Sequence, residues 1–255
     1  MARILDQLLH TRCLRHWRRA ASGTAAAPLG ELRRQRGQAR ALRAQLDDFL
    51  RGAEARLALP KMGSQAFPRE QGTDWGWRPD LWCRPLAERG IASAAPATRL
   101  NGGVQLFHDC PRAELSLRQL RNTRPEDLAP FGLRMDVFEF DGSFLSLSID
   151  LPAGAADGLT RGHLVQLGCA LEAEHPLDIF ARLNIEHGPN TEQIVRELPQ
   201  PGQTQSALVE FDLAYSRLNE KRTGKIWLDL IFEAPEMNQI VLRDLTLARL
   251  RRAAI

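Results

Sequence analysis

Lysine is nearly absent from this sequence. Of its 34 basic residues only Lys61, Lys221 and Lys225 are lysines, and the others are arginines. Genomic base composition explains such a bias, and a phosphate-binding surface is the alternative, because arginine holds phosphate in a bidentate fork. The formal net charge of +3 also hides an asymmetry: residues 1–60 hold 12 arginines and 5 acids, a net of +7, so the remainder carries −4. A basic segment therefore precedes a mildly acidic one.

Cysteines and long apolar runs are also scarce. The four cysteines, at positions 13, 83, 110 and 169, lack the C-x-x-C spacing of zinc sites, and no disulfide scaffold is indicated. No run of 18 apolar residues exists, and charged residues interrupt the first twenty positions too often for a signal peptide. We therefore expect a cytoplasmic protein, with peripheral contact to a membrane as an additional option.

Nucleotide-binding and hydrolase motifs are missing as well. The chain has no G-x-x-x-x-G-K-[ST] loop, no G-x-G-x-x-G fingerprint, no G-x-S-x-G elbow and no H-E-x-x-H sequence. His108-Asp109-Cys110 sets three reactive groups side by side, but successive side chains of a strand point to opposite faces and cannot converge on one ion. We predict no catalytic residue, no metal site and no cofactor. A polysaccharide-processing enzyme stays open, since it needs only two facing carboxylates.

The basic segment, residues 1–60, reads as two helices. Residues 2–19 form an amphipathic pattern, residues 20–30 are small and flexible and predict a linker, and residues 31–59 predict a second helix that Pro60 ends. The second helix carries a heptad-like apolar stripe: Leu32, Ala39, Leu42, Leu46, Phe49 and Ala53. Packing on the parent domain, self-association and a protein partner remain alternatives, and the first helix could also lie on an anionic membrane surface.

Residues 61–100 are rich in proline and glycine and predict an irregular arm. Three of the five tryptophans, Trp75, Trp77 and Trp82, fall within eight residues of it. Exposed aromatic area of this size would be costly in water. We therefore expect the arm to be pinned by its tryptophans onto the domain that follows, and whether it covers a sheet face there is left open.

Residues 101–255 show the period-two alternation of a β domain. In the clearest case Ile226, Leu228, Leu230 and Phe232 alternate with Trp227, Asp229, Ile231 and Glu233. Ten such segments follow one another, several are separated by turn signals such as Asp141-Gly142 and Pro201-Gly202, and no long helix lies between them. The pattern predicts a mainly β fold, an antiparallel, jelly-roll-like β-sandwich preceded by an α-helical segment.

Several strings of this domain resemble a known group of proteins. Residues 183–192, 210–215, 218–222 and 237–245 are similar to an uncharacterised bacterial family, classed only as a domain of unknown function, and the resemblance covers roughly residues 72–252. It implies no activity. The closing strand, Leu242 to Leu247, also looks like the last strand of jelly-roll carbohydrate-binding modules, although such a strand is generic.

The polar faces of the clearest strands suggest a ligand site. If the aliphatic faces form the core, one outward sheet face carries an aromatic ring among carboxylates, an amide and a guanidinium, which is the set that a sugar needs. The candidate ligand-binding residues are Arg182, Asn184, Glu186, His187, Asn190, Glu210, Asp212, Trp227 and Asp229, with His187 to Asn190 at the rim. A structural reading stands beside this one, because the outward face of any antiparallel sheet is polar.

These patterns together predict a non-catalytic binding or interaction module with a carbohydrate as the favoured ligand. The first alternative is a structural or oligomeric subunit that associates through the N-terminal helices, and the second is the polysaccharide-processing enzyme. Binding to nucleic acid is disfavoured, because the β domain is acidic and carries no recognised motif.

Overall fold

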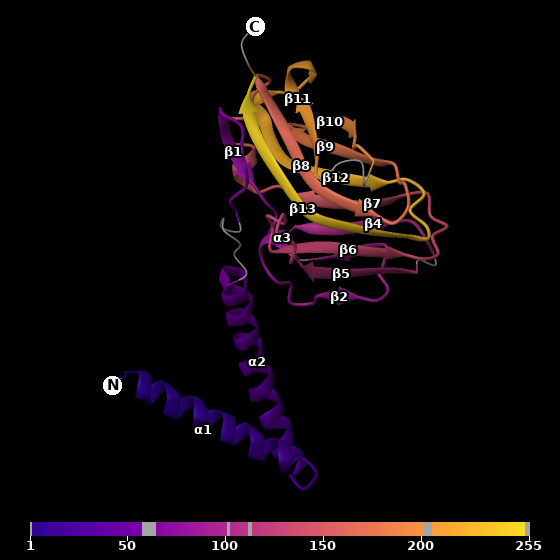
Figure 1. The fold of residues 1–255 in the computed structure, drawn as a ribbon. Coiled ribbons are helices and arrows are strands. Elements are labelled where there is room, and N and C mark those ends of the chain that lie inside the picture. Colours follow the sequence, from indigo (N-terminus) through magenta and orange to yellow (C-terminus); the bar gives the residue numbers. More distant parts are fainter. Residues whose placement is uncertain (1, 58–64, 101–102, 112–113, 201–205, 253–255) are drawn as a thin grey trace. The chain divides into compact units, whose positions relative to one another are not determined.

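The computed structural model describes residues 2–57, 65–100, 103–111, 114–200 and 206–252 (Figure 1). The chain divides into two compact units, residues 1–50 and residues 51–255. The first unit is helical and the second is built from β-strands. The predicted boundary at residue 60 lies among residues that the structure does not describe.

The helical unit consists of α1 (Ala2–Ser22) and most of α2 (Leu29–Leu57). Pro28 directly precedes α2 and its carbonyl accepts the N–H of Leu32 at 3.0 Å. The two helices diverge from the turn between them and hardly contact each other (Figure 1). Among the described side chains, none from His10 to Leu50 is buried. In the part of the chain that is described, no helix combines the length and apolar character that a membrane crossing requires.

The β unit is a sandwich of two sheets. The seven-stranded sheet has the order β11-β8-β13-β6-β5-β2, with β1 paired to β13, and the six-stranded sheet has the order β10-β9-β12-β7-β4-β3. Every ladder that the structure describes in them is antiparallel, which confirms the predicted sandwich. The strands are β1 (Thr73–Trp77), β2 (Gly90–Ile91), β3 (Ala97–Arg99), β4 (Val104–His108), β5 (Leu115–Arg121), β6 (Phe131–Val137), β7 (Leu145–Asp150), β8 (His163–Ala173), β9 (Ile179–His187), β10 (Asn190–Glu197), β11 (Ala207–Asp212), β12 (Thr223–Phe232) and β13 (Asn238–Arg251).

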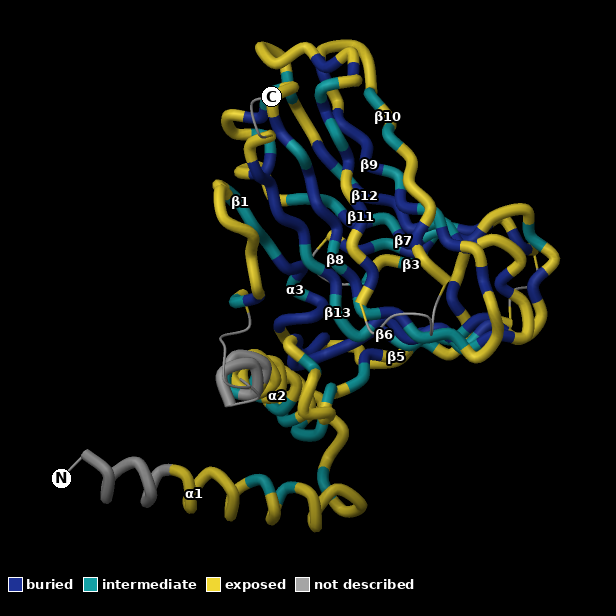
Figure 2. Tube along the Cα trace, turned by 45° about the horizontal axis from the view of Figure 1, so that its top comes forward, coloured by how far each residue is buried: buried dark blue, intermediate teal, exposed yellow. Residues whose placement is uncertain are grey.

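The core lies between the two sheets and is built from the inward half of each strand. On β12, Ile226, Leu228, Leu230 and Phe232 are all at most 5% exposed, whereas Trp227 and Ile231 between them are partly exposed. Buried and more exposed positions alternate along the strands in Figure 2. This alternation follows from the pleat, which points successive side chains to opposite faces, and the two inner faces interdigitate as a single core.

The tryptophan-rich segment is more regular than an arm. It contains β1, the short helix α3 (Asp80–Cys83), β2 and β3, each short strand pairing with a longer neighbour. Trp82 is fully buried and its indole N–H donates to the carbonyl of Leu242 at 3.0 Å. Trp75 and Trp77 lie on β1, which pairs with β13 in the seven-stranded sheet. The segment is therefore fastened to the β unit. Its strand β1 extends the seven-stranded sheet and does not cover the outward face of the six-stranded one. Residues 61–64 lie outside the described residues.

Candidate binding face on the six-stranded sheet

The outward face of the six-stranded sheet brings four of the predicted residues together. In the registers of β12 with β7 and with β9, Trp227 lies opposite Asp150 and Asn184, and Asp229 lies opposite Ser148 and Arg182. Because Ile226 and Leu228 point into the core, Trp227 and Asp229 point away from it. The structure thus places Arg182, Asn184, Trp227 and Asp229 side by side on one face.

A buried network underlies this face. Asp229 is 5% exposed, and its Oδ2 accepts from Arg182 Nε at 3.1 Å, Arg182 Nη2 at 2.9 Å and Asn184 Nδ2 at 2.8 Å. Asn184 is fully buried, and its Oδ1 accepts from Gln193 Nε2 at 2.9 Å. Asn184 is closed to solvent, and Asp229 is nearly so, with three hydrogen bonds to its Oδ2 from within the protein. Their effect is to hold the guanidinium of Arg182 in one place, since a buried carboxylate needs such donors.

The groups that a ligand could reach are those above this network. The side chain of Arg182 is 36% exposed and Trp227 is partly exposed. Lys225 is exposed, and its Nζ lies 5.7 Å from the centroid of the Trp227 ring and 2.8 Å from Asp150 Oδ1. The result is an indole flanked by a carboxylate and two cations, one of which sits within cation–π range of the ring.

A second row of side chains crosses the same face, and the candidate residues predicted from the sequence did not include it. The registers align Phe107, Ser146, Ile231 and Phe180 across β4, β7, β12 and β9, and all four are partly exposed. Strand parity could have found Phe180, because it alternates with the inward residues Ile179 and Ala181. The face therefore offers apolar surface as well as the polar groups around Trp227.

Two predicted residues, Glu210 and Asp212, lie in the other sheet, so the expectation of one shared face is wrong for them. Both are on β11, which pairs with β8 in the seven-stranded sheet. There Glu210 Oε1 accepts from Gln166 Nε2 at 2.9 Å, and Asp212 Oδ1 accepts from the N–H of Ala214 at 2.9 Å. The alternation of side chains along a strand shows which residues face outward, but it does not show which sheet the strand joins.

The remaining predicted residues are Glu186 of the face and His187 and Asn190 of the rim. Glu186 and Asn190 are exposed near the turn between β9 and β10, where Gly188 has a φ of 63° that favours glycine. His187 is 7% exposed, and its Nδ1 lies 3.4 Å from the N–H of Asn219. His187 therefore supports the turn from below and does not project from it.

The side chains of His108, Asp109 and Cys110 do not converge on one point, in agreement with the prediction from strand geometry. His108 is buried with Nε2 at 3.1 Å from the carbonyl of Ala94, while Cys110 Sγ donates to Asp141 Oδ1 at 2.8 Å. Asp109 accepts hydrogen bonds from the hydroxyl of Ser143 and, at 2.7 Å, from its backbone N–H. These bonds, of which the one from the hydroxyl has the largest effect, hold the pKa of Asp109 below its ordinary value. Among the described residues no group of His, Cys, Asp and Glu is placed to hold a metal ion.

The seven-stranded sheet carries a hollow of about 690 Å³ on its outward side. Its floor includes small residues, Gly168, Ala170 and Thr246, and a Cβ on Gly168 would lie 2.9 Å from Thr246 Oγ1. Glu172 stands in it and accepts from both Arg124 and Arg243. The hollow is lined by segments that lie far apart in the sequence, and no local sequence pattern predicted it.

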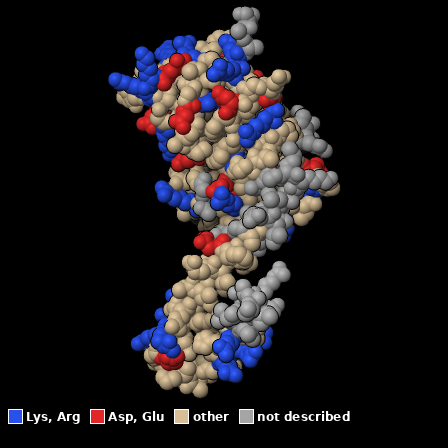
Figure 3. Space-filling model, turned by 90° about the vertical axis from the view of Figure 1, so that its left-hand side faces the viewer, with Lys and Arg blue, Asp and Glu red and all other residues tan. Residues whose placement is uncertain are grey.

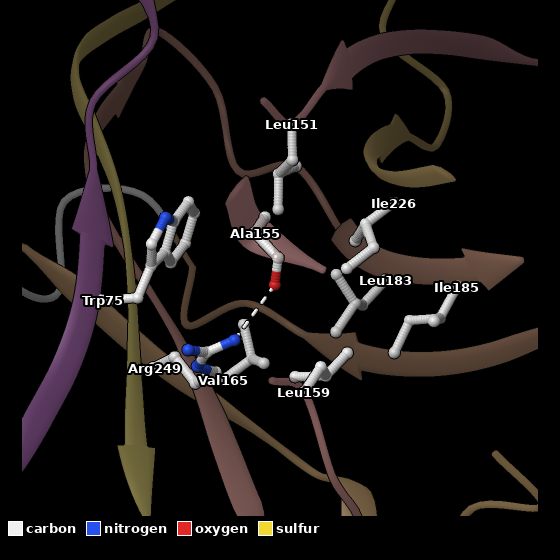
Figure 4. Close-up of a pocket in the computed structure, with 9 residues that line it drawn as sticks. All are labelled: Trp75, Leu151, Ala155, Leu159, Val165, Leu183, Ile185, Ile226 and Arg249. Carbon is white, nitrogen blue, oxygen red and sulfur yellow. Dashed lines mark hydrogen bonds between the residues drawn. The ribbon is translucent and has the colours of Figure 1, made fainter. Parts of the chain in front are cut away.

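A second hollow is an internal void at one end of the sandwich. Figure 4 shows apolar side chains from both sheets converging on it, with Trp75 on one side and Arg249 Nη1 donating to the carbonyl of Ala155 at 3.2 Å. Its volume of about 10 Å³ suits at most one water molecule. This void is a packing feature and not a ligand site.

Charge is distributed differently over the two units. In Figure 3, basic and acidic side chains are interspersed over the visible side of the β unit, while basic ones prevail on the helical unit. Residues 10–50 hold nine arginines against Glu31, Asp47 and Asp48. The candidate face thus lies on the unit with the mixed charge.

The whole chain matches one known protein family. The model of a family of unknown function, DUF6478, matches residues 1–255. The chain belongs to this family. The resemblance to an uncharacterised family that the sequence suggested is thereby confirmed, over a longer stretch. No curated protein matches the chain.

Among solved structures, the chain is similar to domains of low sequence identity. It is similar to the enzymatically active domain of tailspike protein 4 of bacteriophage CBA120, with 9% identity, a TM-score of 0.40, and coverage of 56% of this chain but only 19% of that one. It is also similar to the family 11 carbohydrate-binding module of Clostridium thermocellum, with 10% identity, a TM-score of 0.39 and coverage of 63% and 96%. A third similar structure is the C-terminal family 22 carbohydrate-binding module of Clostridium thermocellum Xyn10B, with 9% identity, a TM-score of 0.40 and coverage of 74% of this chain and 100% of that one. Likenesses of this size say nothing about the ligand of this chain.

Proposed function

We propose that this chain is a non-catalytic binding module that holds a carbohydrate, or another polyol, on the outward face of the six-stranded sheet. The observation that carries the proposal is the environment of Trp227. Its partly exposed ring lies beside Asp150 and Lys225, with Arg182 on the neighbouring strand held by the buried pair Asn184 and Asp229. An indole face packs against the C–H groups of a sugar ring, and the fixed polar groups donate to and accept from its hydroxyls.

Preorganisation supports binding on this face. Arg182 is tied down by two hydrogen bonds to Asp229, so that little side-chain freedom is lost when a ligand contacts it. Lys225 ends in a flexible ammonium group and can move from the ring to a ligand hydroxyl. The buried residues Asn184 and Asp229 thus fix the position of Arg182, and the exposed groups of this face contact the ligand.

A catalytic role for the same face is less well supported. A polysaccharide-processing enzyme needs two carboxylates that face each other across the substrate and can exchange protons. Here Asp229 is buried and bonded to Arg182 and Asn184, and Asp150 is paired with Lys225 at 2.8 Å. Of these two carboxylates only that of Asp150 is exposed, and one accessible carboxylate does not supply the facing pair.

The test is a glycan-array screen of the full chain, followed by calorimetry on any glycan that binds. Trp227→Ala is expected to raise the dissociation constant at least about tenfold, which corresponds to about 1.4 kcal/mol. Tyr215→Ala is the matched control, because Tyr215 is 82% exposed and lies in the 3-10 helix Leu213–Tyr215, which follows β11. Its affinity should equal that of the wild type.

Two outcomes would contradict the proposal. One is a folded Trp227→Ala protein that binds the glycan as tightly as the wild type. The other is the absence of binding to every glycan on an array on which a known carbohydrate-binding module is detected.

A further inference from the structure

Helix α2 presents an apolar stripe that the helical unit leaves uncovered. Leu46 is 52% exposed, Phe49 is 69% exposed and Leu50 is 49% exposed. The first half of the stripe, with Leu32, Ala39 and Leu42, is only partly buried. Most of the stability of a helix in a protein comes from the packing of its apolar face, so these exposed residues call for a partner.

The spacing of the stripe fits one particular kind of partner. Assigned to a heptad, position a holds Leu32, Ala39, Leu46 and Ala53, and position d holds Gln35, Leu42 and Phe49. Seven consecutive core positions therefore carry one polar residue, Gln35. A sustained repeat of 3.5 residues matches the seam of a left-handed coiled coil, and a single polar residue in the seam sets its register.

The charges beside the stripe select a direction. Position e holds Arg36 and Arg43, and the facing position g holds Glu31 and Gln38. In a parallel pair, g of one helix lies beside the next e of the other, so Glu31 meets Arg36 and Gln38 meets Arg43. In an antiparallel pair, e lies beside e, and because Leu50 is the third residue at position e, the arginines of one helix lie beside Leu50 or the arginines of the other. Glu31 already accepts from Arg34 and Gln35 of its own helix, but its side chain remains 37% exposed and has acceptor capacity left.

We propose that α2 pairs in parallel with α2 of a second copy of this chain, through the seam from Leu32 to Ala53. Positions b and c hold Arg33, Arg34 and Arg40 away from the seam, so that of the arginines between positions 31 and 50 only Arg36 and Arg43 border it. Each dimer carries two β units and thus two candidate binding faces, which raises avidity for a repeating ligand. The pairing itself is independent of what those faces bind.

The test is the mass of the full chain in solution, measured by light scattering after size exclusion and by sedimentation equilibrium. The expected mass is twice 28.6 kDa. Leu42→Glu/Leu46→Glu, with both changes in the seam, should raise the dimer dissociation constant at least about a hundredfold. Ala41→Glu/Ala44→Glu is the matched control, since it adds the same charge at positions c and f, and should remain dimeric. Circular dichroism of the strands verifies that each variant keeps its β unit.

Charge reversal and cross-linking test the direction. Glu31→Arg and Arg36→Glu should each weaken the dimer, and the double variant should restore it. In a Cys13→Ser background, Gln35→Cys should form a disulfide between the two copies under a mild oxidant, because only parallel helices bring the two positions 35 together. A monomeric wild type, a dimer that survives the seam variant, an equal loss in the control, or the lack of both rescue and cross-link would overturn the proposal. None of these results depends on glycan binding.

Discussion

Arg78 and Asp244 lie 166 positions apart in the sequence and form a two-pronged buried ion pair. Arg78 Nε donates to Asp244 Oδ1 and Arg78 Nη2 donates to Asp244 Oδ2, each at 2.8 Å. The side chain of Arg78 is fully buried and that of Asp244 is 16% exposed. Asp244 stands where the register of β13 with β8 shifts, so the pair fastens the segment after β1 to the bulge of the last strand.

Breaking this pair should destabilise the β unit strongly. We expect Arg78→Met to lower the free energy of unfolding by about 3–5 kcal/mol, because it leaves the carboxylate of Asp244 buried without its partner. Urea unfolding followed by circular dichroism measures the change. Arg84→Met is the control: its pair with Asp80 is at 3.7 Å and largely exposed, and it should cost less than about 1 kcal/mol. Equal losses in the two variants would refute this account.

Asn184 should matter for stability more than its position on the candidate face suggests. Asn184→Ala removes a donor to Asp229 and an acceptor for Gln193, both in a buried setting. We expect a loss of about 1–3 kcal/mol in the free energy of unfolding. Thr191→Ala on the neighbouring strand β10 is exposed and should change it by less than about 0.5 kcal/mol. A neutral Asn184→Ala would contradict the stabilising role that is assigned here to the buried bonds of Asn184.

The ion cluster around Glu172 predicts a pH dependence. Burial by itself raises the pKa of Glu172, but the guanidinium groups of Arg243 and Arg124 outweigh it and hold that pKa below the ordinary 4.5. A carboxyl with a lowered pKa in the folded state stabilises the protein above its unfolded pKa, and the contribution is lost as the pH falls through its folded pKa. The melting temperature of the wild type should therefore exceed that of Glu172→Gln at pH 7, and the difference should shrink as the pH falls below 4.5 and through the lowered pKa of the folded state. A constant difference from pH 7 to pH 3 would contradict this.

The cysteines should differ sharply in reactivity. Burial raises the pKa of the thiols of Cys83 and Cys169 to about 12 in each case, and Cys110 is also buried. Cys13 is exposed on α1. Because the thiolate is the reactive form, one thiol per chain should react rapidly with a disulfide reagent at pH 8, and Cys13→Ser should abolish that phase. All four should react in denaturant, and a second fast thiol in the native protein would show that one of the buried sites opens.

Local periodicity predicted the inner and outer faces of the strands, and it did so for a physical reason. The pleat makes side-chain direction a property of the strand alone, so Ile226 and Trp227 could be assigned to opposite faces without knowing any neighbour. Helix α2 could likewise be predicted from its apolar stripe, although it begins at Leu29 and α1 ends at Ser22, both inside residues 20–30 that were predicted to be a linker. The alternating pattern predicted a strand over residues 135–140 and missed the start of β6 at Phe131, since Gly132 weakens a strand pattern. In the structure Gly132 is packed so tightly that a Cβ would lie 3.1 Å from both Arg243 Cα and the Leu242 carbonyl.

The sequence by itself thus determined the fold class, the helical segment, and which side chains point outward. Only the tertiary structure decided which strands share a sheet. It placed β11 beside β8, so Glu210 and Asp212 left the candidate face, while β9 and β12 came together and joined Arg182 to Asp229. Strand order depends on pairings between segments that are distant along the chain, and alternation within one strand carries no record of them. The buried bonds of Asn184 and the hollow around Glu172 depend on such pairings, and no local pattern could have foretold them.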